Sequence, residues 1–153
     1  MKLWVDADAS PAEMKEVVFR ASRRLALETV LVANQSIGIP VAYPTVRSVC
    51  VRAGPDAADH HIARTAEPGD VAVTADIALA ARLVARSVAT IDPRGEEYTA
   101  DNVGARLSVR NFNEELRGAG VKTGGPRPYG PKEKKAFAAA LDRVLTRALR
   151  ARR

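Results

Sequence analysis

Short apolar runs alternate with segments of helical periodicity over the first ninety residues of the chain. The apolar runs are four to six residues long, which is the usual length of buried strands. Between them, apolar residues recur at every third or fourth position, which predicts helices that bury one face. The pattern predicts strands at residues 2–5, 29–33, 46–51, 71–74 and 88–91, and helices at residues 11–25, 56–66 and 77–86.

Strands that alternate with helices favour a mostly parallel sheet joined by right-handed crossovers. We therefore predict an α/β fold of three layers, in which helices cover both faces of a sheet of about five strands. A loop that holds Pro40 and Pro44 separates the second and third strands. Ser10 is predicted to cap the first helix, because Pro11 and Glu13 follow it at the positions that a capping box requires.

The pattern changes after residue 99, where only helical periodicity remains. Short helices are predicted from Thr99 to Leu107 and from Arg110 to Arg117, and a segment rich in Gly and Pro follows them. A last helix from about Pro131 to Arg150 carries an apolar stripe that requires a packing partner. We therefore expect one domain over residues 1–153, in which residues 99–153 form a helical C-terminal extension.

The net charge of +6 arises entirely from residues 132–153, which hold eight Lys or Arg and two acids. A basic segment of this kind is typical of nucleic-acid binding, and it begins with Lys132, Lys134 and Lys135. A solvated helix face that aids solubility is the alternative explanation.

Other features of composition bound the class of protein. No apolar run is long enough to span a bilayer, and the chain begins with a strand in place of a signal peptide. We therefore expect a cytoplasmic protein without a membrane partner. Cys50 is the single cysteine, so an internal disulfide is impossible. Its place in the strand-like run from Val46 to Val51 predicts a buried, structural thiol.

Aspartates follow three of the predicted strands. Asp6 and Asp8 follow the first strand, Asp76 follows the fourth, and Asp92 follows the fifth. Ligands of open α/β sheets bind beyond the carboxyl ends of the strands. Carboxylates crowded there repel one another unless a cation or shared protons neutralise them, and oxygen ligands suit Mg²⁺ or Mn²⁺. The sequence therefore predicts an acidic, metal-dependent site.

Structural roles for these acids remain open. Asp6 and Asp8 alternate along the strand and point to opposite faces, unless a turn begins at Asp8. An aspartate at a strand end also serves as a turn or cap residue. Asp59, the fifth candidate, lies one turn after Asp56 on the same helix face, where acids also favour the helix dipole.

Two segments have the chemistry of phosphate contacts. Arg94 lies in the turn Asp92-Pro93-Arg94-Gly95, and an arginine beside an acidic metal site suits a phosphate ligand. Lys122 precedes Thr123-Gly124-Gly125-Pro126, whose backbone amides would suit an anion. That segment lacks the Gly-Lys-Ser/Thr of a phosphate-binding loop. The chain also has no Gly-x-Ser-x-Gly nucleophile motif.

Six short strings occur along the chain in this order: Val5-Asp6-Ala7-Asp8-Ala9-Ser10-Pro11, Ala33-Asn34-Gln35, Asp56-x-x-Asp59-x-x-Ile62, Gly69-Asp70-Val71-x-Val73-Thr74-Ala75-Asp76-Ile77, Asp92-Pro93-Arg94-Gly95 and Thr123-Gly124-Gly125-Pro126. Together they resemble the motifs of the YaiI/YqxD family of uncharacterised bacterial proteins, and the resemblance covers nearly the whole chain in the right order. One departure is that the family commonly has Cys where this chain has Ser10, so a cysteine-based mechanism at that position is disfavoured.

The family in turn is similar to PIN-like nucleases, which hold one or two Mg²⁺ or Mn²⁺ ions at the strand ends of a Rossmann-like sheet. The resemblance implies metal ligation by Asp6, Asp59 and Asp76, with Asp92 as the fourth acid and Asp8 as its competitor. It implies a divalent-metal-dependent nuclease, with RNA favoured over DNA as the partner. Those five aspartates are then the candidate catalytic residues, and the candidate nucleic-acid contacts are Asn34, Arg94, Lys122, Lys132, Lys134 and Lys135.

Two other functions remain open. Asp6-x-Asp8-x-Ser10 imitates the opening motif of haloacid-dehalogenase phosphatases, whose first Asp is the nucleophile. That mechanism needs a downstream Lys, and the sequence has none between Lys15 and Lys122. A non-catalytic protein that binds nucleic acid or nucleotide is favoured by the basic tail and disfavoured by the intact set of acids.

Overall fold

A mostly parallel sheet of six strands forms the centre of the computed structural model, which describes residues 1–8, 10–52, 54, 56–120 and 128–152. The strand order is β3-β2-β1-β4-β5-β6, and only the β5–β6 pair is antiparallel. The strands are β1 (Leu3–Asp6), β2 (Thr29–Ala33), β3 (Val46–Cys50), β4 (Val71–Val73), β5 (Ala89–Ile91) and β6 (Glu97–Tyr98).

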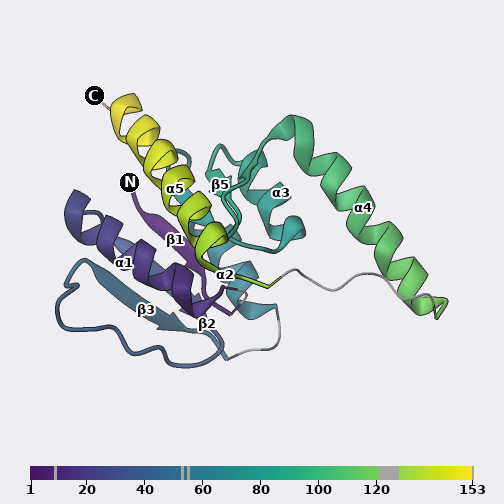
Figure 1. Ribbon diagram of the computed structural model, residues 1–153, viewed down its shortest axis with the longest axis horizontal. Coiled ribbons are helices and arrows are strands. Elements are labelled where there is room, and N and C mark those ends of the chain that lie inside the picture. Colours follow the sequence, from purple (N-terminus) through teal and green to yellow (C-terminus); the bar gives the residue numbers. More distant parts are fainter. Residues whose placement is uncertain (9, 53, 55, 121–127, 153) are drawn as a thin grey trace.

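Helices cover both faces of this sheet (Figure 1). On one face, α1 (Ala12–Leu25) and α5 (Pro131–Ala151) bury Met14 and Phe137 against Leu3 and Val5. On the other face, α2 (Ala57–Thr65) and α3 (Ile77–Ala85) pack against Trp4 and its neighbours on β2 and β4. Successive residues of β1 point to opposite faces, so β1 contributes to both cores. The predicted three-layer α/β fold is confirmed.

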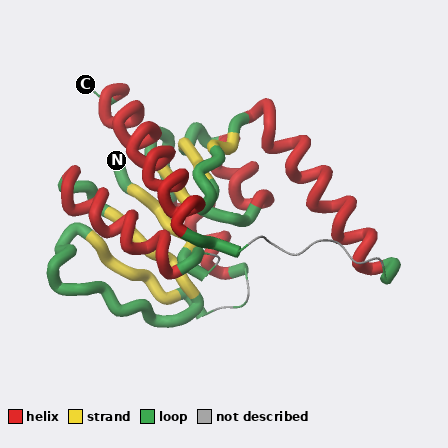
Figure 2. Tube along the Cα trace, in the orientation of Figure 1, coloured by secondary structure: helices red, strands yellow, loops and turns green. Residues whose placement is uncertain are grey.

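Strands are added to one side of β1 first and to its other side afterwards. It moves from β1 to β2 and β3, and then crosses to β4 on the other side of β1. The carboxyl ends of β1 and β4 therefore flank a topological switch point, where ligands of such sheets bind. The long loop predicted between the second and third strands is present between β2 and β3 (Figure 2).

The C-terminal part differs from the prediction in two ways. Residues 97–98 add the antiparallel edge strand β6, which two residues are too short to reveal by pattern. The two short helices are one 19-residue helix, α4 (Ala100–Gly118), which begins with a capping box between Thr99 and Asn102. No Gly or Pro lies between the two predicted segments to break it. Figure 1 shows α4 extending away from the sheet, and no residue of α4 is buried.

Two local predictions are wrong. Ser10 does not cap α1, since Pro11 occupies that position and the Ser10 hydroxyl donates to the Asp6 carbonyl at 2.6 Å. Cys50 is exposed, because β3 is the edge strand of the sheet. The stripe on α5 does pack on the core, through Phe137, Leu141, Val144 and Leu145. None of the described helices has the length and apolar character needed to cross a membrane.

Candidate functional site

Three of the predicted acids converge at the switch point. Asp6 is the last residue of β1 and is 2% exposed. Asp76 follows β4 and occupies the N-cap of α3, and Asp59 lies in the first turn of α2. Their carboxyl groups interact directly enough to alter one another's pKa. We call Asp6, Asp59 and Asp76 the acidic site.

Thr74 and the start of α3 hold two of these carboxylates in place. The Thr74 hydroxyl donates to Asp6 Oδ2 at 2.9 Å and accepts the Asp76 backbone N–H at 3.0 Å. Asp76 Oδ1 accepts the backbone N–H groups of Ala78 and Leu79 at 2.9 and 3.2 Å. These bonds satisfy two amides that would otherwise lack partners at the helix start. Asp6 and Asp76 are therefore positioned by the folded backbone, with little freedom to rotate.

Asp59 holds a proton at neutral pH. Burial raises its pKa to about 8, with further contributions from its hydrogen bond to Asp76 and from the negative charges of Asp6, Asp76 and Asp56. Burial is the main reason why the pKa of Asp6 is raised, and the negative charges of Asp76 and Asp8 raise it further. The hydrogen bonds with Thr74 and Asp59 act in the opposite direction. Crowded acids resolve their repulsion in this way, by sharing protons.

Asp76 is the ionised member of the site. Burial acts to raise its pKa, but the hydrogen bond from Asp59 and the amides of Leu79 and Ala78 lower it below the usual value. The positive charge of Arg110 on α4 acts in the same direction. One neutral and one ionised carboxyl group therefore lie side by side, which is a frequent arrangement in functional sites.

The chemistry of the acidic site fits a divalent cation. Three carboxyl groups supply the oxygen ligands that Mg²⁺ and Mn²⁺ prefer, and a cation would bind in place of the proton on Asp59. Within the described ranges, no group of three or more acidic, His or Cys side chains is already arranged to hold a metal. Cation binding would therefore have to reorient at least one carboxyl group.

Asp8 and Asn34 lie at the rim of the acidic site. Asp8 is exposed, and both its carboxylate oxygens accept the Asn34 backbone N–H, at 2.8 and 3.1 Å. The contact joins the segment after β1 to the end of β2. Asp8 is close enough to Asp6 to raise its pKa, but the Asp8 carboxylate accepts the backbone N–H of Asn34. Asn34 Oδ1 is buried and has no hydrogen-bond partner among the described residues.

Asp92 serves the turn between β5 and β6. Its Oδ1 accepts the backbone N–H groups of Arg94 and Glu96, both at 2.9 Å. Its Oδ2 accepts Arg106 Nη2 at 3.2 Å. The structure thus places Asp92 beside an arginine and not among the three acids that share protons.

A pocket of about 450 Å³ adjoins the acidic site, since Ala75 and Ile77 on either side of Asp76 line it. Two arginines face tyrosine rings there. The guanidinium of Arg106 lies 4.3 Å from the Tyr98 ring centre, and that of Arg94 lies 6.0 Å from the Tyr129 ring centre. These cation–π contacts hold both guanidinium groups at the pocket, where their charge suits recognition of phosphate.

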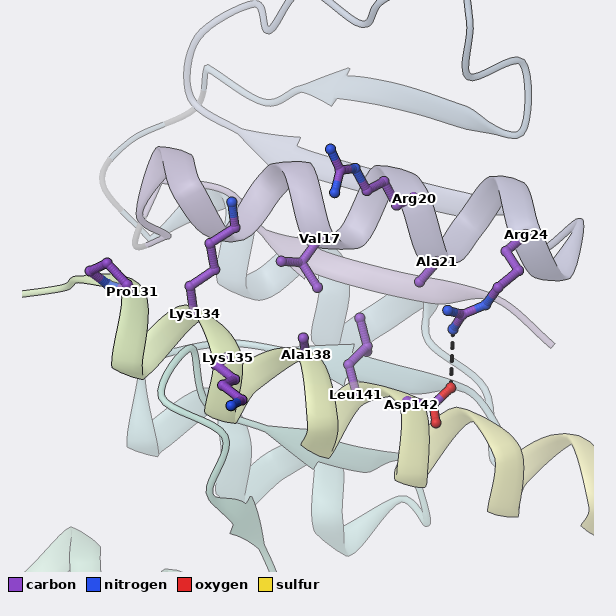
Figure 3. A pocket seen from close by; sticks show the side chains of 10 residues that line it. All are labelled: Val17, Arg20, Ala21, Arg24, Pro131, Lys134, Lys135, Ala138, Leu141 and Asp142. Carbon is purple, nitrogen blue, oxygen red and sulfur yellow. Dashed lines mark hydrogen bonds and ion pairs between the residues drawn. The ribbon is translucent and has the colours of Figure 1, made fainter.

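The basic residues of α5 lie elsewhere. Lys134 and Lys135 line a groove of about 400 Å³ between α1 and α5, which we call the α1–α5 groove (Figure 3). Lys134 Nζ donates to Glu16 at 3.1 Å, and Lys132 is exposed. None of the three acids lines this groove. Lys122 lies outside the described residues.

Sequence reasoning missed Thr74 as a partner of the acids, and it missed the arginines of α4. Thr74 stands two residues before Asp76 within a matched string, which was the available signal. Arg106 and Arg110 are spaced i, i+4, but the predicted break between two helices hid their shared face. Only the packing of α4 on α3 brings them to the acidic site.

Comparisons of the sequence with known proteins identify its family. The family described as "Uncharacterized BCR, YaiI/YqxD family" matches residues 4–147. A UPF0178 protein of Myxococcus xanthus is 55% identical over 148 residues, covering 96% of this chain and 95% of its own. One from Syntrophobacter fumaroxidans is 51% identical, covering 96% and 95%, and one from Shewanella amazonensis is 46% identical, covering 96% and 98%. No solved structure matches the chain. The chain therefore belongs to the YaiI/YqxD family, which is described as uncharacterised.

Proposed function

We propose that this protein is a divalent-cation-dependent phosphodiesterase that acts on nucleic acid, with RNA favoured over DNA. The observation that carries the proposal is the convergence of Asp6, Asp59 and Asp76 at the switch point, with a proton held between Asp59 and Asp76. Holding three carboxyl groups together costs stability unless something neutralises them. A cation bound for function explains why the fold retains them.

Asp6, Asp59 and Asp76 would hold Mg²⁺ or Mn²⁺. When bound, such an ion lowers the pKa of its water and stabilises charge on a phosphate. The chain's own part is to orient the carboxylates through Thr74 and the α3 amides. Asp59 gives up its proton as the ion binds, because metal ligands must be deprotonated.

Arg94 and Arg106 would contact the phosphate of the substrate from the adjoining pocket. Asp92 is then a positioning residue, because it fixes Arg106 through a charged hydrogen bond at 3.2 Å. Glu133 Oε1 lies 3.9 Å from Arg94 Nη1, which is an ion pair and not a hydrogen bond. The acids and the arginines together provide cation and anion sites side by side, as phosphodiester hydrolysis requires.

The test combines metal binding with cleavage. Calorimetric titration of Mn²⁺ and Mg²⁺ at pH 6, 7 and 8 should show affinity rising with pH, by up to about tenfold per unit, because one proton is released. Asp76→Asn should remove saturable binding and slow cleavage of single-stranded RNA by about a hundredfold or more. Asp101→Asn, an exposed acid in the first turn of α4, is the control. Cleavage that persists unchanged in Asp76→Asn would contradict the assignment.

A non-catalytic nucleic-acid-binding protein is the second candidate. Its supporting observation is that the acids already have protein partners and are not arranged as a ligand set within the described ranges. Salt-dependent binding of RNA without cleavage, in Mg²⁺ and in Mn²⁺, would favour it.

A phosphatase of the haloacid-dehalogenase type gains no comparable support. Asp70, the other acid in the matched string, accepts Trp4 Nε1 and the Lys2 backbone N–H at the opposite end of β4. It therefore lies too far from Asp76 to act as a paired acid. Trapping of an acyl-phosphate on Asp6 would revive this alternative.

A further inference from the structure

The groove between α3 and α4 carries positive charge without acids in its lining. It has a volume of about 400 Å³, and we call it the α3–α4 groove. Among the described residues, its polar lining is Arg106, Arg110, Asn113 and Arg117. The carboxylates that pair with Arg106 and Arg110, which are Asp92, Glu96 and Glu114, lie outside this lining. Because α4 buries none of its 19 residues, packing in the core does not account for these arginines.

The four polar residues form one face of α4. They recur at i, i+4, i+7 and i+11, which places them in a single row along three turns. The row is about 16 Å long at the rise of an α-helix. Val109 also lines the groove and is 60% exposed, so apolar surface adjoins the row. A positively charged groove that follows the backbone is one of the features with which proteins bind single strands.

The α3–α4 groove meets the acidic site at one end. Ile77, which lines the groove, is the residue directly after Asp76. Arg106 lines both this groove and the pocket that holds Arg94. A polyanion in the groove would therefore continue to the site where the proposed hydrolysis takes place.

We propose that the α3–α4 groove binds a single strand of nucleic acid and leads it to the acidic site. The inference rests on the proposed function, because it names the route by which that substrate arrives. Arg110 and Arg117 contact successive phosphates, and Val109, which also lines the groove, offers apolar surface to a base. The ion pair of Arg110 with Glu114 lies on the surface, at 3.3 Å, and an exposed pair of this kind is weak enough to exchange for phosphate.

The α1–α5 groove has about the same volume but a different charge (Figure 3). Arg24 is paired with Asp142 across it at 3.0 Å. Glu16 pairs with both Arg20 and Lys134, at 2.7 and 3.1 Å. Asp142 lies in the lining itself, so this groove holds a carboxylate among its lining residues, and it lies over the opposite face of the sheet from α3. It provides a matched control for the α3–α4 groove.

The test compares two double variants that remove the same charge. Arg110→Gln/Arg117→Gln alters the α3–α4 groove, and Arg20→Gln/Arg24→Gln alters the α1–α5 groove. Fluorescence anisotropy with a labelled single-stranded 12-mer RNA, in EDTA and at several NaCl concentrations, reports binding without cleavage. The α4 variant should bind about tenfold more weakly. Its slope of log affinity against log salt should fall by about 1.4, as expected for two lost phosphate contacts.

The control variant should bind like the unaltered protein. The proposal would be overturned by an equal loss of RNA affinity in both double variants or by a loss in the control variant alone. Tighter binding of duplex than of single-stranded RNA would also overturn it. The proposed function is tested separately, by metal-dependent cleavage and its dependence on Asp76. RNA binding that depends on Arg110 and Arg117 but is not followed by cleavage would contradict the proposed function and support the binding role of the α3–α4 groove. Metal-dependent cleavage by an Arg110→Gln/Arg117→Gln protein that binds RNA normally would support the proposed function and contradict the role of the groove.

Discussion

Replacement of Asp59 by Asn tests whether the acidic site holds a proton. Burial and the neighbouring charges raise the pKa of Asp59 to about 8. The folded protein therefore keeps a proton that the unfolded chain loses above about pH 4. The contribution of Asp59 to stability is fully present below that pH and is lost as the pH rises to 8. Asn cannot ionise, so Asp59→Asn should remove this loss.

The size of the effect follows from the shift. One proton retained in the folded state lowers the free energy of unfolding by about 1.4 kcal/mol per pH unit, or almost 6 kcal/mol over the full window. Asp59 is only partly buried, so solvent screens the interaction, and we expect about half, roughly 3 kcal/mol between pH 4 and pH 8. Asp6 acts in the same direction, since burial raises its pKa.

Urea unfolding at pH 5, 6, 7 and 8 in EDTA measures this dependence. The unaltered protein should lose stability across the series, and Asp59→Asn should lose much less. Burial lowers the pKa of His61, so His61 contributes a change of opposite sign, which cancels in the difference between the two proteins. Asp101→Asn should behave as the unaltered protein. Equal slopes for Asp59→Asn and the unaltered protein would refute the reasoning about the shared proton.

Two further predictions concern stability. Asp70→Ala should lower the free energy of unfolding by about 3 kcal/mol in urea, because Lys2 N, Trp4 Nε1 and Glu67 N would lose their acceptor. Glu115→Ala, at an exposed position of α4, should change it by less than about 0.5 kcal/mol, and equal effects of the two changes would contradict the role of Asp70. Gly95→Ala should cost about 2 kcal/mol or more, since φ is +92° and the new Cβ would lie 2.6 Å from the Ala136 carbonyl oxygen of α5. The control is Gly104→Ala in α4, whose new Cβ meets nothing within 4 Å and which should stabilise the protein by up to about 1 kcal/mol in thermal unfolding. A Gly95→Ala protein as stable as the unaltered one would contradict the predicted cost of the close approach to α5.

Local patterns were sufficient for most of the secondary structure. The second strand is Thr29–Ala33 in both prediction and structure, because a buried strand of a parallel sheet must be apolar on both faces. The alternation of strands and helices then determined the three-layer α/β class. The boundaries within residues 99–118 failed, since exposed helices lack the strong periodicity that burial imposes.

Only the tertiary structure decided which acids meet. Asp6, Asp59 and Asp76 are distant in sequence, and they converge because β4 pairs with β1 across the switch point. Asp92 also follows a strand, but the tight turn to β6 offers it two amides and Arg106, which satisfy its carboxylate locally.

The same distinction explains two other differences between the sequence-based expectations and the structure. Cys50 lies in a strand-like run, but its exposure depends on β3 being the edge strand. Arg110 reaches Asp76 only because α4 packs on α3. Composition and periodicity determine which elements form, since these depend on neighbouring residues. The pairing order of the strands and the choice among hydrogen-bond partners depend on contacts between distant segments, and these contacts create the site.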